Sequence, residues 1–360
     1  MLVRRKSSLV TLCAAALVLS VSTALPAQSS AAAAHRQTRF EEVDLVSDQP
    51  GKAQITDPNL VNPWGMSIGK FLWVSDADKD LSTVYSGGGA AGAVHKQGLE
   101  VKVAGGPTGQ VFNPGHGFVV STKKGSGPAM FLSATESGTI RGWNPQADPA
   151  TALLGAKVKG ASFKGLTMVW IHGRPFLLAA DFLNGRIDVF NSHFRLLPTF
   201  RAFRDRGLPP GYAPFNVAAV GGTVFVAYAK RKPGEADEIA GPGRGFVSQF
   251  TASGHFLRRF ASRGPLNAPW AITVAPRSFG TFAGALLVGN FGDGRINAFD
   301  RRSGRFMGPL RRADGSAISV DGLWGLVPGT AANGGRNALW FAAGVDDEKH
   351  GLVGLIRPAY

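Results

Sequence analysis

The pattern of apolar and turn-forming residues is clearest between residues 268 and 310. The short apolar runs APWAITV, ALLVGN and INAF alternate with turns that contain Gly, Asn or Asp, and a fourth run, RFMGPL, follows them. Runs of this length, rich in β-branched and aromatic residues and bounded by such turns, are typical of β-strands. The segment therefore predicts four short antiparallel strands joined by tight turns.

The same plan recurs along the chain with a period near 50 residues. Five more segments carry similar strand runs: NPWGMSI to LSTVYS at 62–86, HGFVV to TIRGWN at 116–144, GLTMVWI to RIDVFN at 165–191, APFNVAAV to GFVSQF at 213–250, and GLWGLV to HGLVGLI at 322–356. The anchor residues of the six first strands are Trp64, Gly117, Leu166, Phe215, Trp270 and Trp324, at steps of 53, 49, 49, 55 and 54 residues. This repeat predicts an all-β fold, a six-bladed β-propeller of four-stranded blades.

Closure of the predicted ring follows from the strands left over at the two ends. The run FEEVDLVS at 40–47 belongs to no unit, and the last unit has three strands before the chain ends. An unpaired blade edge would be exposed to unwanted strand pairing. We therefore expect the strand at 40–47 to close the ring as the outer strand of the last blade.

Residues 1–34 are expected to be a cleaved signal peptide. Arg4, Arg5 and Lys6 precede an apolar stretch at 9–24, and AAA at 32–34 fits a small-residue cleavage site. The general secretion route is the simpler interpretation, with a twin-arginine route as the alternative. Removing the three positive charges would change the formal net charge from +15 to +12.

The cysteine content and the apolar runs limit what the exported chain can contain. Cys13 is the only cysteine and lies in the leader, so disulfides, zinc–thiolate sites and thiol nucleophiles are not expected. No later stretch reaches the 18 or so apolar residues that a membrane-spanning helix needs. We expect one propeller domain over residues 40–360, in a secreted, extracellular and monomeric protein that does not span a membrane.

Several segments resemble a largely uncharacterised family of exported bacterial proteins with predicted β-propeller folds. These segments are LVSDQPGKAQITDPNLVNPWGM, FLSATESGTIRGWNP, DFLNGRIDVF, GYAPFN, LNAPWAITVAPRSFGTFAGALLVGNFGDGRINAFD, DGLWGL and HGLVG. The family resembles NHL-type propellers in its paired strand motifs. The resemblance implies the propeller fold and supplies no catalytic residues. The last unit departs from the pattern, because FAAGVDDEKHG lacks the Asp or Asn of several other units.

Polar side chains recur where the second strand of several units ends. Asp76, Asp181 and Asn290 occupy this position, with Thr135, Tyr228 and Gly344 at similar places. Carboxylate and amide oxygens that converge on the axis could hold Ca²⁺, which takes six to eight oxygen ligands. Alternatively, each side chain caps the turn that follows its own strand, as Asx residues commonly do. We prefer the capping interpretation and keep Ca²⁺ as the alternative.

Aromatic and histidine side chains on the first strands are candidates for a ligand site in the channel. Trp64, Phe215, Trp270 and Trp324 could stack on a flat ligand, with Asn216 beside them, or they could pack adjacent blades together. We prefer packing, with Trp64 and Trp324 partly exposed. His116 is predicted at the start of an inner strand, and His350 in a turn. Either could act as a base or a ligand, although no zinc-binding spacing is present.

Arginines cluster after the third strands of units three to five. They are Arg195, Arg201, Arg204, Arg206, Arg258, Arg259, Arg263, Arg301, Arg302, Arg305, Arg311 and Arg312. On a propeller these stretches form the outer hairpins, so a basic arc is expected on one side of the rim. Such an arc could bind anionic cell-envelope polymers, or it could be a solvated edge that prevents aggregation. Nucleic acid is not expected, because the arc lacks interleaved aromatic residues.

The sequence leaves two functions open. The preferred one is a module that binds envelope polymers or another exported protein. The alternative is a Ca²⁺-dependent hydrolase or lactonase with its site at the mouth of the central channel. A Gly- and Pro-rich insertion of mixed charge at 230–244 interrupts the fourth unit, and loops of this length are either functional or disordered. Fold alone decides neither function.

Overall fold

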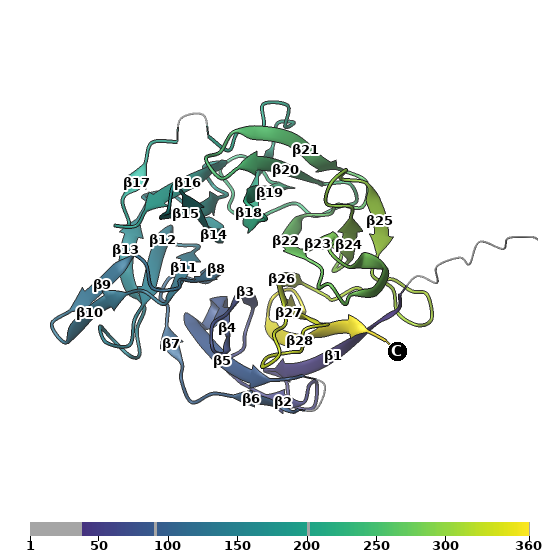
Figure 1. The fold of residues 1–360 in the computed structure, drawn as a ribbon, viewed down its shortest axis with the longest axis horizontal. Helices are drawn as coiled ribbons and strands as arrows, with labels where there is room; N and C mark the ends of the chain where they lie inside the picture. Colours follow the sequence, from purple (N-terminus) through teal and green to yellow (C-terminus); the bar gives the residue numbers. More distant parts are fainter. Residues whose placement is uncertain (1–37, 90–91, 200–201, 360) are drawn as a thin grey trace, which may run out of the picture. The chain divides into compact units, whose positions relative to one another are not determined.

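Six sheets, each built on four antiparallel strands, form a ring in the computed structural model of this chain (Figure 1). The structure describes residues 38–89, 92–199 and 202–359. The predicted signal peptide at 1–34, with Cys13, lies outside the described residues. The prediction of a six-bladed β-propeller is confirmed, and the blades are numbered 1 to 6 in chain order below.

The strands of each blade are given from the axis outwards. Blade 1 comprises β3 (Pro63–Ile68), β4 (Leu72–Asp76), β5 (Leu81–Gly87) and β6 (Val94–Lys96), with β7 (Val101–Lys102) also on β5. Blade 2 comprises β8 (Pro107–Phe112), β11 (Phe131–Thr135), β12 (Thr139–Trp143) and β13 (Leu153–Lys157), with a separate hairpin of β9 (Val119–Thr122) and β10 (Gly125–Pro128). Blade 3 comprises β14 (Phe163–Ile171), β15 (Arg174–Asp181), β16 (Arg186–Asn191) and β17 (Leu196–Leu197).

The other three blades follow the same order. Blade 4 comprises β18 (Tyr212–Val220), β19 (Thr223–Lys230), β20 (Gly245–Thr251) and β21 (Phe256–Ser262). Blade 5 comprises β22 (Pro269–Val274), β23 (Leu286–Asn290), β24 (Ile296–Phe299) and β25 (Phe306–Pro309). Blade 6 comprises β26 (Leu323–Pro328), β27 (Leu339–Val345), β28 (His350–Pro358) and β1 (Phe40–Ser47), with β2 (Ile55–Thr56) on β1. Two 3₁₀ turns, η1 (Ala77–Lys79) and η2 (Gly280–Phe282), complete the described elements.

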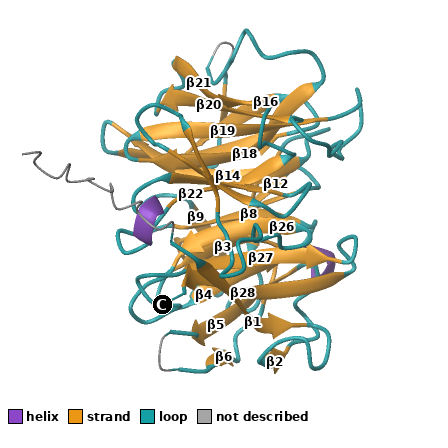
Figure 2. Cartoon of the chain, turned by 90° about the vertical axis from the view of Figure 1, so that its right-hand side faces the viewer, coloured by secondary structure: helices purple, strands orange, loops and turns teal. Residues whose placement is uncertain are grey.

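The N-terminal strand closes the ring. β1 runs antiparallel to β28, from the pair Phe40 and Pro358 to the pair Ser47 and Leu352, and the two lie side by side in both views (Figures 1 and 2). The N-terminal end of β1 also packs on blade 5, because the ring of Phe40 lies 4.6 Å from that of Phe279. The prediction that residues 40–47 complete the last blade is therefore confirmed, with the same bounds.

Burial follows the order of strands in each blade. The second strands β4, β11 and β23 are buried at every position, whereas the outer strands β13, β21 and β25 are largely open to solvent. A second strand has a neighbouring blade against each of its faces, so its apolar residues run continuously instead of alternating. The core of the protein is therefore the set of interfaces between blades.

Each innermost strand contains a register shift at the same place. The pairing between first and second strands shifts after Pro63 in blade 1, after Pro214 in blade 4 and after Pro269 in blade 5, and the other three blades show the same irregularity. A β-bulge re-aims the side chain that it carries. The side chains at this position are Trp64, Thr108, Lys164, Phe215, Trp270 and Trp324. They define the inner end of each blade.

The predicted inner strand of blade 2 is wrong. The innermost strand is β8, and HGFVV leads instead into the extra β9–β10 hairpin, so the anchor is Thr108 and not Gly117. The run PTGQVF of β8 has few apolar residues, whereas HGFVV imitates a buried strand. In blade 3 the anchor is Lys164 and not Leu166. The corrected steps between anchors are 44, 56, 51, 55 and 54 residues.

The helical content gives one further observation. Within the ranges that the structure describes, no helix is long and apolar enough to cross a membrane.

A glycine in β28 provides a test of ring closure. A Cβ at Gly354 would lie 2.3 Å from the carbonyl oxygen of Val43 in β1 and 2.6 Å from the ring of Phe341. We expect Gly354→Ala to lower the free energy of unfolding by about 1–3 kcal/mol, because the closing strand must move away. The matched control is Gly98→Ala, since a Cβ at Gly98 meets nothing within 4 Å. Equal melting temperatures for the two variants would contradict this account of closure.

Candidate binding site at the axial mouth

Three tryptophans and a phenylalanine from different blades meet on the axis. The rings of Trp64 and Trp324 are stacked with their centroids 3.4 Å apart, and Trp270 meets both edge-on at 6.1 and 5.8 Å. Phe215 lies 5.7 Å from Trp324. Trp64 and Trp324 are 2% and 1% exposed, so the expectation that they are partly exposed is wrong. They form an aromatic floor across the channel.

Asn62 holds the two stacked indoles. Its Oδ1 accepts hydrogen bonds from the Nε1–H groups of Trp64 (2.9 Å) and Trp324 (3.2 Å), and its Nδ2 lies 3.4 Å from an oxygen of Asp78. Its φ of 48° is a left-handed conformation that Asn tolerates better than most residues. The third indole, of Trp270, donates to the main-chain carbonyl of Lys164 at 2.9 Å. All three polar edges are therefore satisfied within the floor.

A polar cavity of about 350 Å³ lies on this floor. Its lining residues are Asn62, Trp64, Asp78, Glu136, Lys164, Asp237, Glu238, Trp324, Asp347, Glu348 and Lys349. We call it the axial mouth. Six carboxyl groups and two ammonium groups line it, in a chain whose formal net charge is +15. A second cavity of about 200 Å³ lies farther along the innermost strands, between Gln110, Thr167, Thr273 and their neighbours.

The acidic residues of the axial mouth come from equivalent turns. Each of them lies between the second and third strands of its blade: Asp78 in blade 1, Glu136 in blade 2, Asp237 and Glu238 in blade 4, and Asp347 and Glu348 in blade 6. These turns all lie at the same end of the ring. The insertion at 230–244, considered above as a functional or disordered loop, supplies two of the six carboxylates.

Lys164 is the central cation of the axial mouth. Its side chain is 3% exposed, and its ammonium group bonds to Glu136 and lies 3.9 Å from an oxygen of Asp237. The same group stands 5.0 Å from the ring centre of Trp64, a cation–π contact with the floor. A buried ammonium is stable only with such partners. The mouth is thus built to hold a positive charge.

Burial and mutual repulsion change the protonation of the inner carboxyls. Burial, followed by the charge of Glu238, raises the pKa of Glu348 to about 7. Burial also raises the pKa of Glu238 and of Asp78. One oxygen of Glu348, Oε1, has no hydrogen-bond partner among the described residues. Near neutral pH the mouth therefore holds a partly protonated acid at Glu348.

The three residues considered for Ca²⁺ are engaged within their own blades. Asp76 accepts from the backbone N–H (3.0 Å) and hydroxyl (2.8 Å) of Thr83, and Asp181 accepts from the backbone N–H of Asn184 at 3.1 Å. Asn290 donates to Asp293, in the turn that follows its own strand, at 2.9 Å. In the part of the chain that the structure describes, no three His, Cys, Asp or Glu side chains gather as metal ligands. Ca²⁺ binding stays a prediction.

The other channel candidates lie away from the axial mouth. His116 follows the innermost strand of blade 2 instead of beginning it, and its ring meets Trp170 edge-on at 5.4 Å. Asn216 links innermost strands, because its Nδ2 donates to the carbonyl of Trp270 at 2.8 Å. His350 is 2.7 Å from Asp48, next to the closing strand. The contacts of His116 and Asn216 join neighbouring blades, whereas that of His350 lies within blade 6.

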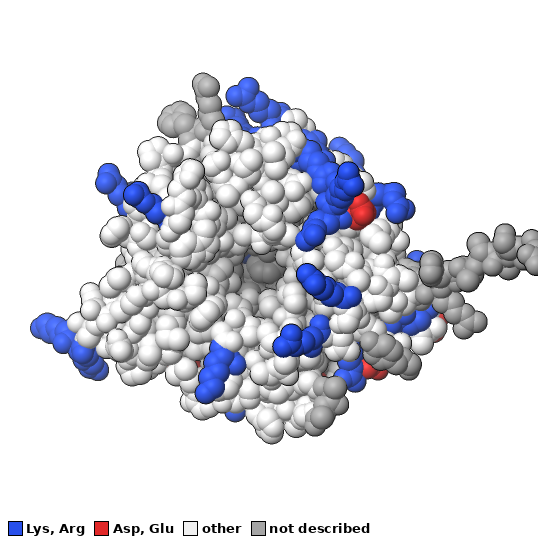
Figure 3. Space-filling model, viewed as in Figure 1, with Lys and Arg blue, Asp and Glu red and all other residues white. Residues whose placement is uncertain are grey.

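The predicted basic arginines that the structure describes lie on the outer strands, turns and connections of blades 3 to 5, and Arg201 lies outside the described residues. Arg259 pairs with Asp205 at 2.6 Å, and Arg258 donates to the carbonyls of Arg301 (3.2 Å) and Arg302 (2.7 Å). Arg301, Arg302 and Arg305 are exposed. Figure 3 shows Lys and Arg gathered near β21 and β25, on a face with few acidic side chains and none around its centre.

The sequence analysis missed most of the axial mouth. Lys164 was not predicted as a site residue, because the sequence pattern placed the anchor of blade 3 at Leu166. Glu136, Asp78 and Glu348 stand one, two and four positions beyond the residues considered at the ends of the second strands. Acidic residues in the turn after the second strand of four units, at TESG, DADK, DEIA and DDEK, were the available signal.

The fold and the site define a six-bladed β-propeller with an acidic cavity at one axial mouth. Two proteins of Acanthamoeba polyphaga mimivirus, both described as uncharacterised, are similar over the propeller: one is 37% identical over 323 residues, covering 87% of this chain and 78% of that protein, and the other 35% identical over 326 residues, covering 87% and 84%. The chain belongs to the family that these proteins represent. No protein-family model matches the sequence.

Solved structures support the fold. An α-L-arabinofuranosidase of Fusarium graminearum, in complex with an iminosugar inhibitor, aligns with a TM-score of 0.52 over 88% of this chain and 97% of the enzyme. The sequence identity is 9%, so this likeness shows the fold alone. The bacterial origin and the relation to NHL-type propellers stay predictions.

Asn62 allows a test of the floor. We expect Asn62→Ala to lower the free energy of unfolding by about 2–4 kcal/mol, because it leaves two buried indole N–H groups without an acceptor. Asn62→Gly keeps the left-handed backbone conformation and should cost nearly as much. Denaturant unfolding checks both variants. If Asn62→Gly is as stable as the unmodified protein, the hydrogen bonds do not stabilise the floor.

The raised pKa of Glu348 predicts a dependence of stability on pH. The native state keeps the proton up to about pH 7, whereas the unfolded chain releases it near the ordinary value of 4.5. Ionisation in the unfolded state thus lowers the free energy of unfolding as the pH rises between these two values. Glu348→Gln should remove this loss and be more stable than the unmodified protein at pH 8, by about 1–2 kcal/mol, after a discount for the partial exposure of Glu348.

At pH 4 the Glu348→Gln variant and the unmodified protein should unfold alike. Asp347→Asn is the matched control, because Asp347 is the next residue and its side chain is 94% exposed. Melting curves across this pH range test the expectation. A constant difference between Glu348→Gln and the unmodified protein at every pH would refute the assignment.

Proposed function

We propose that the protein is an exported binding module whose axial mouth captures an organic ammonium group. The observation that carries the proposal is the reversal of charge at the mouth. Six carboxyl groups against two ammonium groups line a cavity of about 350 Å³, although Lys and Arg outnumber Asp and Glu by 39 to 24 in the whole chain. A cleft lined by one sign of charge concentrates ligands of the opposite sign.

The residues of the mouth favour an ammonium group by their chemistry. Lys164 already shows how such a group is held there, between Glu136 and Asp237 and over the ring of Trp64. Glu348 and Glu238 are part-buried acceptors beside it, and the Oε1 atom of Glu348 has no donor among the residues described. A ligand ammonium would supply donors to this side of the cavity and favour the ionised form of Glu348.

The floor argues against recognition by ring stacking. Trp64 and Trp324 face each other and are almost fully buried, so a ligand in the mouth would meet carboxylates and the edges of the indoles. Selectivity should therefore depend on the charge of the ligand and only weakly on its aromatic or sugar-like character.

Titration calorimetry with a diamine tests the proposal. Butane-1,4-diamine should bind, and butane-1,4-diol, which has the same length and no charge, should not. Glu238→Gln should weaken binding about fivefold and Lys349→Ala should strengthen it about fivefold, since one charge at a half-exposed site is worth about 1 kcal/mol. Binding should weaken as salt is added.

Glu235→Gln is the matched control for the variants at the mouth. Glu235 belongs to the same insertion as Glu238 but pairs with Lys232 at 3.3 Å and does not line the cavity. It should leave the affinity unchanged. Equal effects of Glu235→Gln and Glu238→Gln, or equal binding of the diol and the diamine, would contradict the proposal.

A hydrolase at the same mouth is the second candidate, and one observation favours it. Glu348, with a pKa of about 7, stands among other carboxyl groups, and a carboxyl that titrates near neutral pH suits general acid and base catalysis. Chromogenic lactones and aryl glycosides are suitable substrates for a first assay. Turnover that disappears in Glu348→Gln and persists in Glu235→Gln, outside the cavity, would favour catalysis over simple binding.

A further inference from the structure

A groove runs along the outer edge of the ring where blade 3 connects to blade 4. Two adjoining pockets, of about 490 and 420 Å³, share Ala202 and Arg204 in their walls. Strands β16 and β17 form one side of the first pocket, and the turn between β20 and β21 forms one side of the second. We call these two pockets the rim groove. The residues that line it include Arg186, Leu196, Phe203, Arg204, Arg206 and His255.

In the connection between blades 3 and 4, anchored residues alternate with exposed ones. This alternation places two arginines in the groove. Phe203 is buried, and its backbone N–H donates to a carbonyl of the β20–β21 turn at 2.8 Å. Asp205 is held by both Nε (2.8 Å) and Nη2 (2.6 Å) of Arg259. These two anchored residues leave Arg204 and Arg206 between and beyond them, exposed to solvent. Neither arginine forms an ion pair with another described residue.

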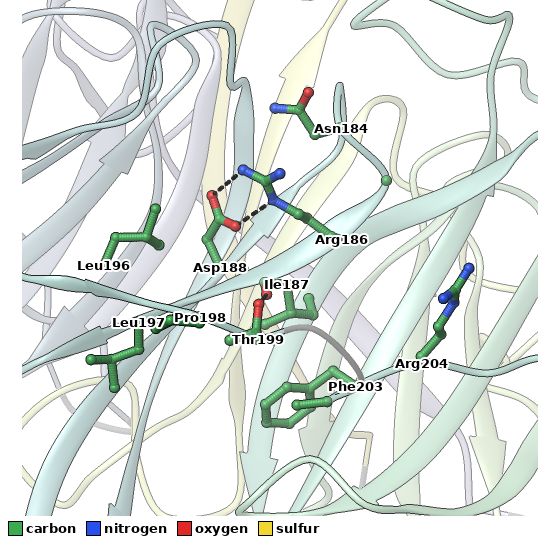
Figure 4. Close-up of a pocket in the computed structure, with 12 residues that line it drawn as sticks. Asn184, Arg186, Ile187, Asp188, Leu196, Leu197, Pro198, Thr199, Phe203 and Arg204 are labelled. Carbon is green, nitrogen blue, oxygen red and sulfur yellow. Dashed lines mark hydrogen bonds and ion pairs between the residues drawn. The ribbon is translucent and has the colours of Figure 1, made fainter.

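A third arginine, Arg186, is held in place by acidic side chains of its own blade. The Nε atom of Arg186 donates to the buried carboxylate of Asp188 at 2.6 Å, and its Nη2 lies 3.6 Å from Asp181. Its side chain is still 49% exposed. Figure 4 shows Arg186 and Arg204 on different sides of the first pocket, with the apolar side chains of Leu196, Leu197 and Phe203 lining other parts of it. Asp188 and Asp181 thus hold Nε and Nη2 of Arg186, and Nη1 is the nitrogen without a partner among the described residues.

We propose that the rim groove binds a linear polyanion that carries carboxylate or phosphate groups. Guanidinium groups match the planar geometry of these oxyanions and bind them through paired hydrogen bonds. Two adjoining pockets lined by Arg186, Arg204 and Arg206 suit a chain of anionic groups better than one small anion. The apolar walls would cover the uncharged parts of the chain. The site is separate from the axial mouth and takes ligands of the opposite charge.

The arginines at the junction of blades 4 and 5 are less suited to this role. Both terminal nitrogens of Arg258 donate hydrogen bonds to the carbonyls of Arg301 and Arg302, so Arg258 stabilises the outer turn of blade 5. Arg301 and Arg302 themselves are exposed and line none of the pockets described above. The surface near Arg301 and Arg302 is positively charged but has no groove among the pockets described above. They therefore provide a control of equal charge.

Binding to two defined polymers tests the proposal. Poly-L-glutamate presents carboxylates and inorganic polyphosphate presents phosphates, and the polymer that binds more tightly identifies the preferred oxyanion. The double variant Arg204→Ala/Arg206→Ala should weaken binding of the preferred polymer at least tenfold. The control Arg301→Ala/Arg302→Ala removes the same charge and should change the affinity less than twofold. Free glutamate and orthophosphate should compete poorly.

Three results would overturn the proposal. They are no binding of either polymer to the unmodified protein, an equal loss in the two double variants, and unchanged binding in Arg204→Ala/Arg206→Ala. Both pairs of arginines are exposed, so melting temperatures should stay the same and a folding defect can be recognised. Glu238→Gln at the axial mouth should leave polymer binding unchanged, which separates this test from that of the ammonium site.

Discussion

The contact between Trp64 and Trp324 joins the first blade to the last, and the architecture of the axis depends on it. The two indoles are stacked at 3.4 Å and donate to the same oxygen of Asn62. At the outer edge of the same seam, β1 pairs along the length of β28. The ring is thus closed twice, by main-chain hydrogen bonds at the rim and by aromatic packing at the axis. A propeller without disulfides is stabilised by such interfaces between blades.

The closed floor makes a binding site possible at the mouth. Aromatic side chains fill the channel, so the cavity above them is closed at one end and does not continue as an open pore. The turns between the second and third strands of four blades line the cavity on this floor and bring acidic residues to it. Lys164 offsets part of their repulsion. The basic rim lies elsewhere, so the molecule separates its charges into an acidic centre and a basic edge.

The sequence was sufficient for the fold because strand length, turn residues and the period near 50 all agree. It also identified the closing strand, since FEEVDLVS had no partner of its own. It failed at β8, where PTGQVF has little apolar character and the neighbouring HGFVV imitates a strand. The side chains at the axis depend on β-bulges, and the convergence of Glu136, Asp237 and Glu348 depends on the closed ring. The bulges have no local sequence pattern, and the acidic residues recur in the turns after the second strands without a pattern that shows that they converge.

The most direct test of the account is to locate a bound ammonium group. A crystal of the protein soaked with 3-bromopropylammonium can be measured at the bromine absorption edge, where the anomalous signal identifies the ligand. We expect a bromine peak within the axial mouth, at a distance that lets the ammonium group reach Glu238 or Glu348. A peak only at other surface carboxylates, or none at the mouth in crystals where that face is open to solvent, would contradict it.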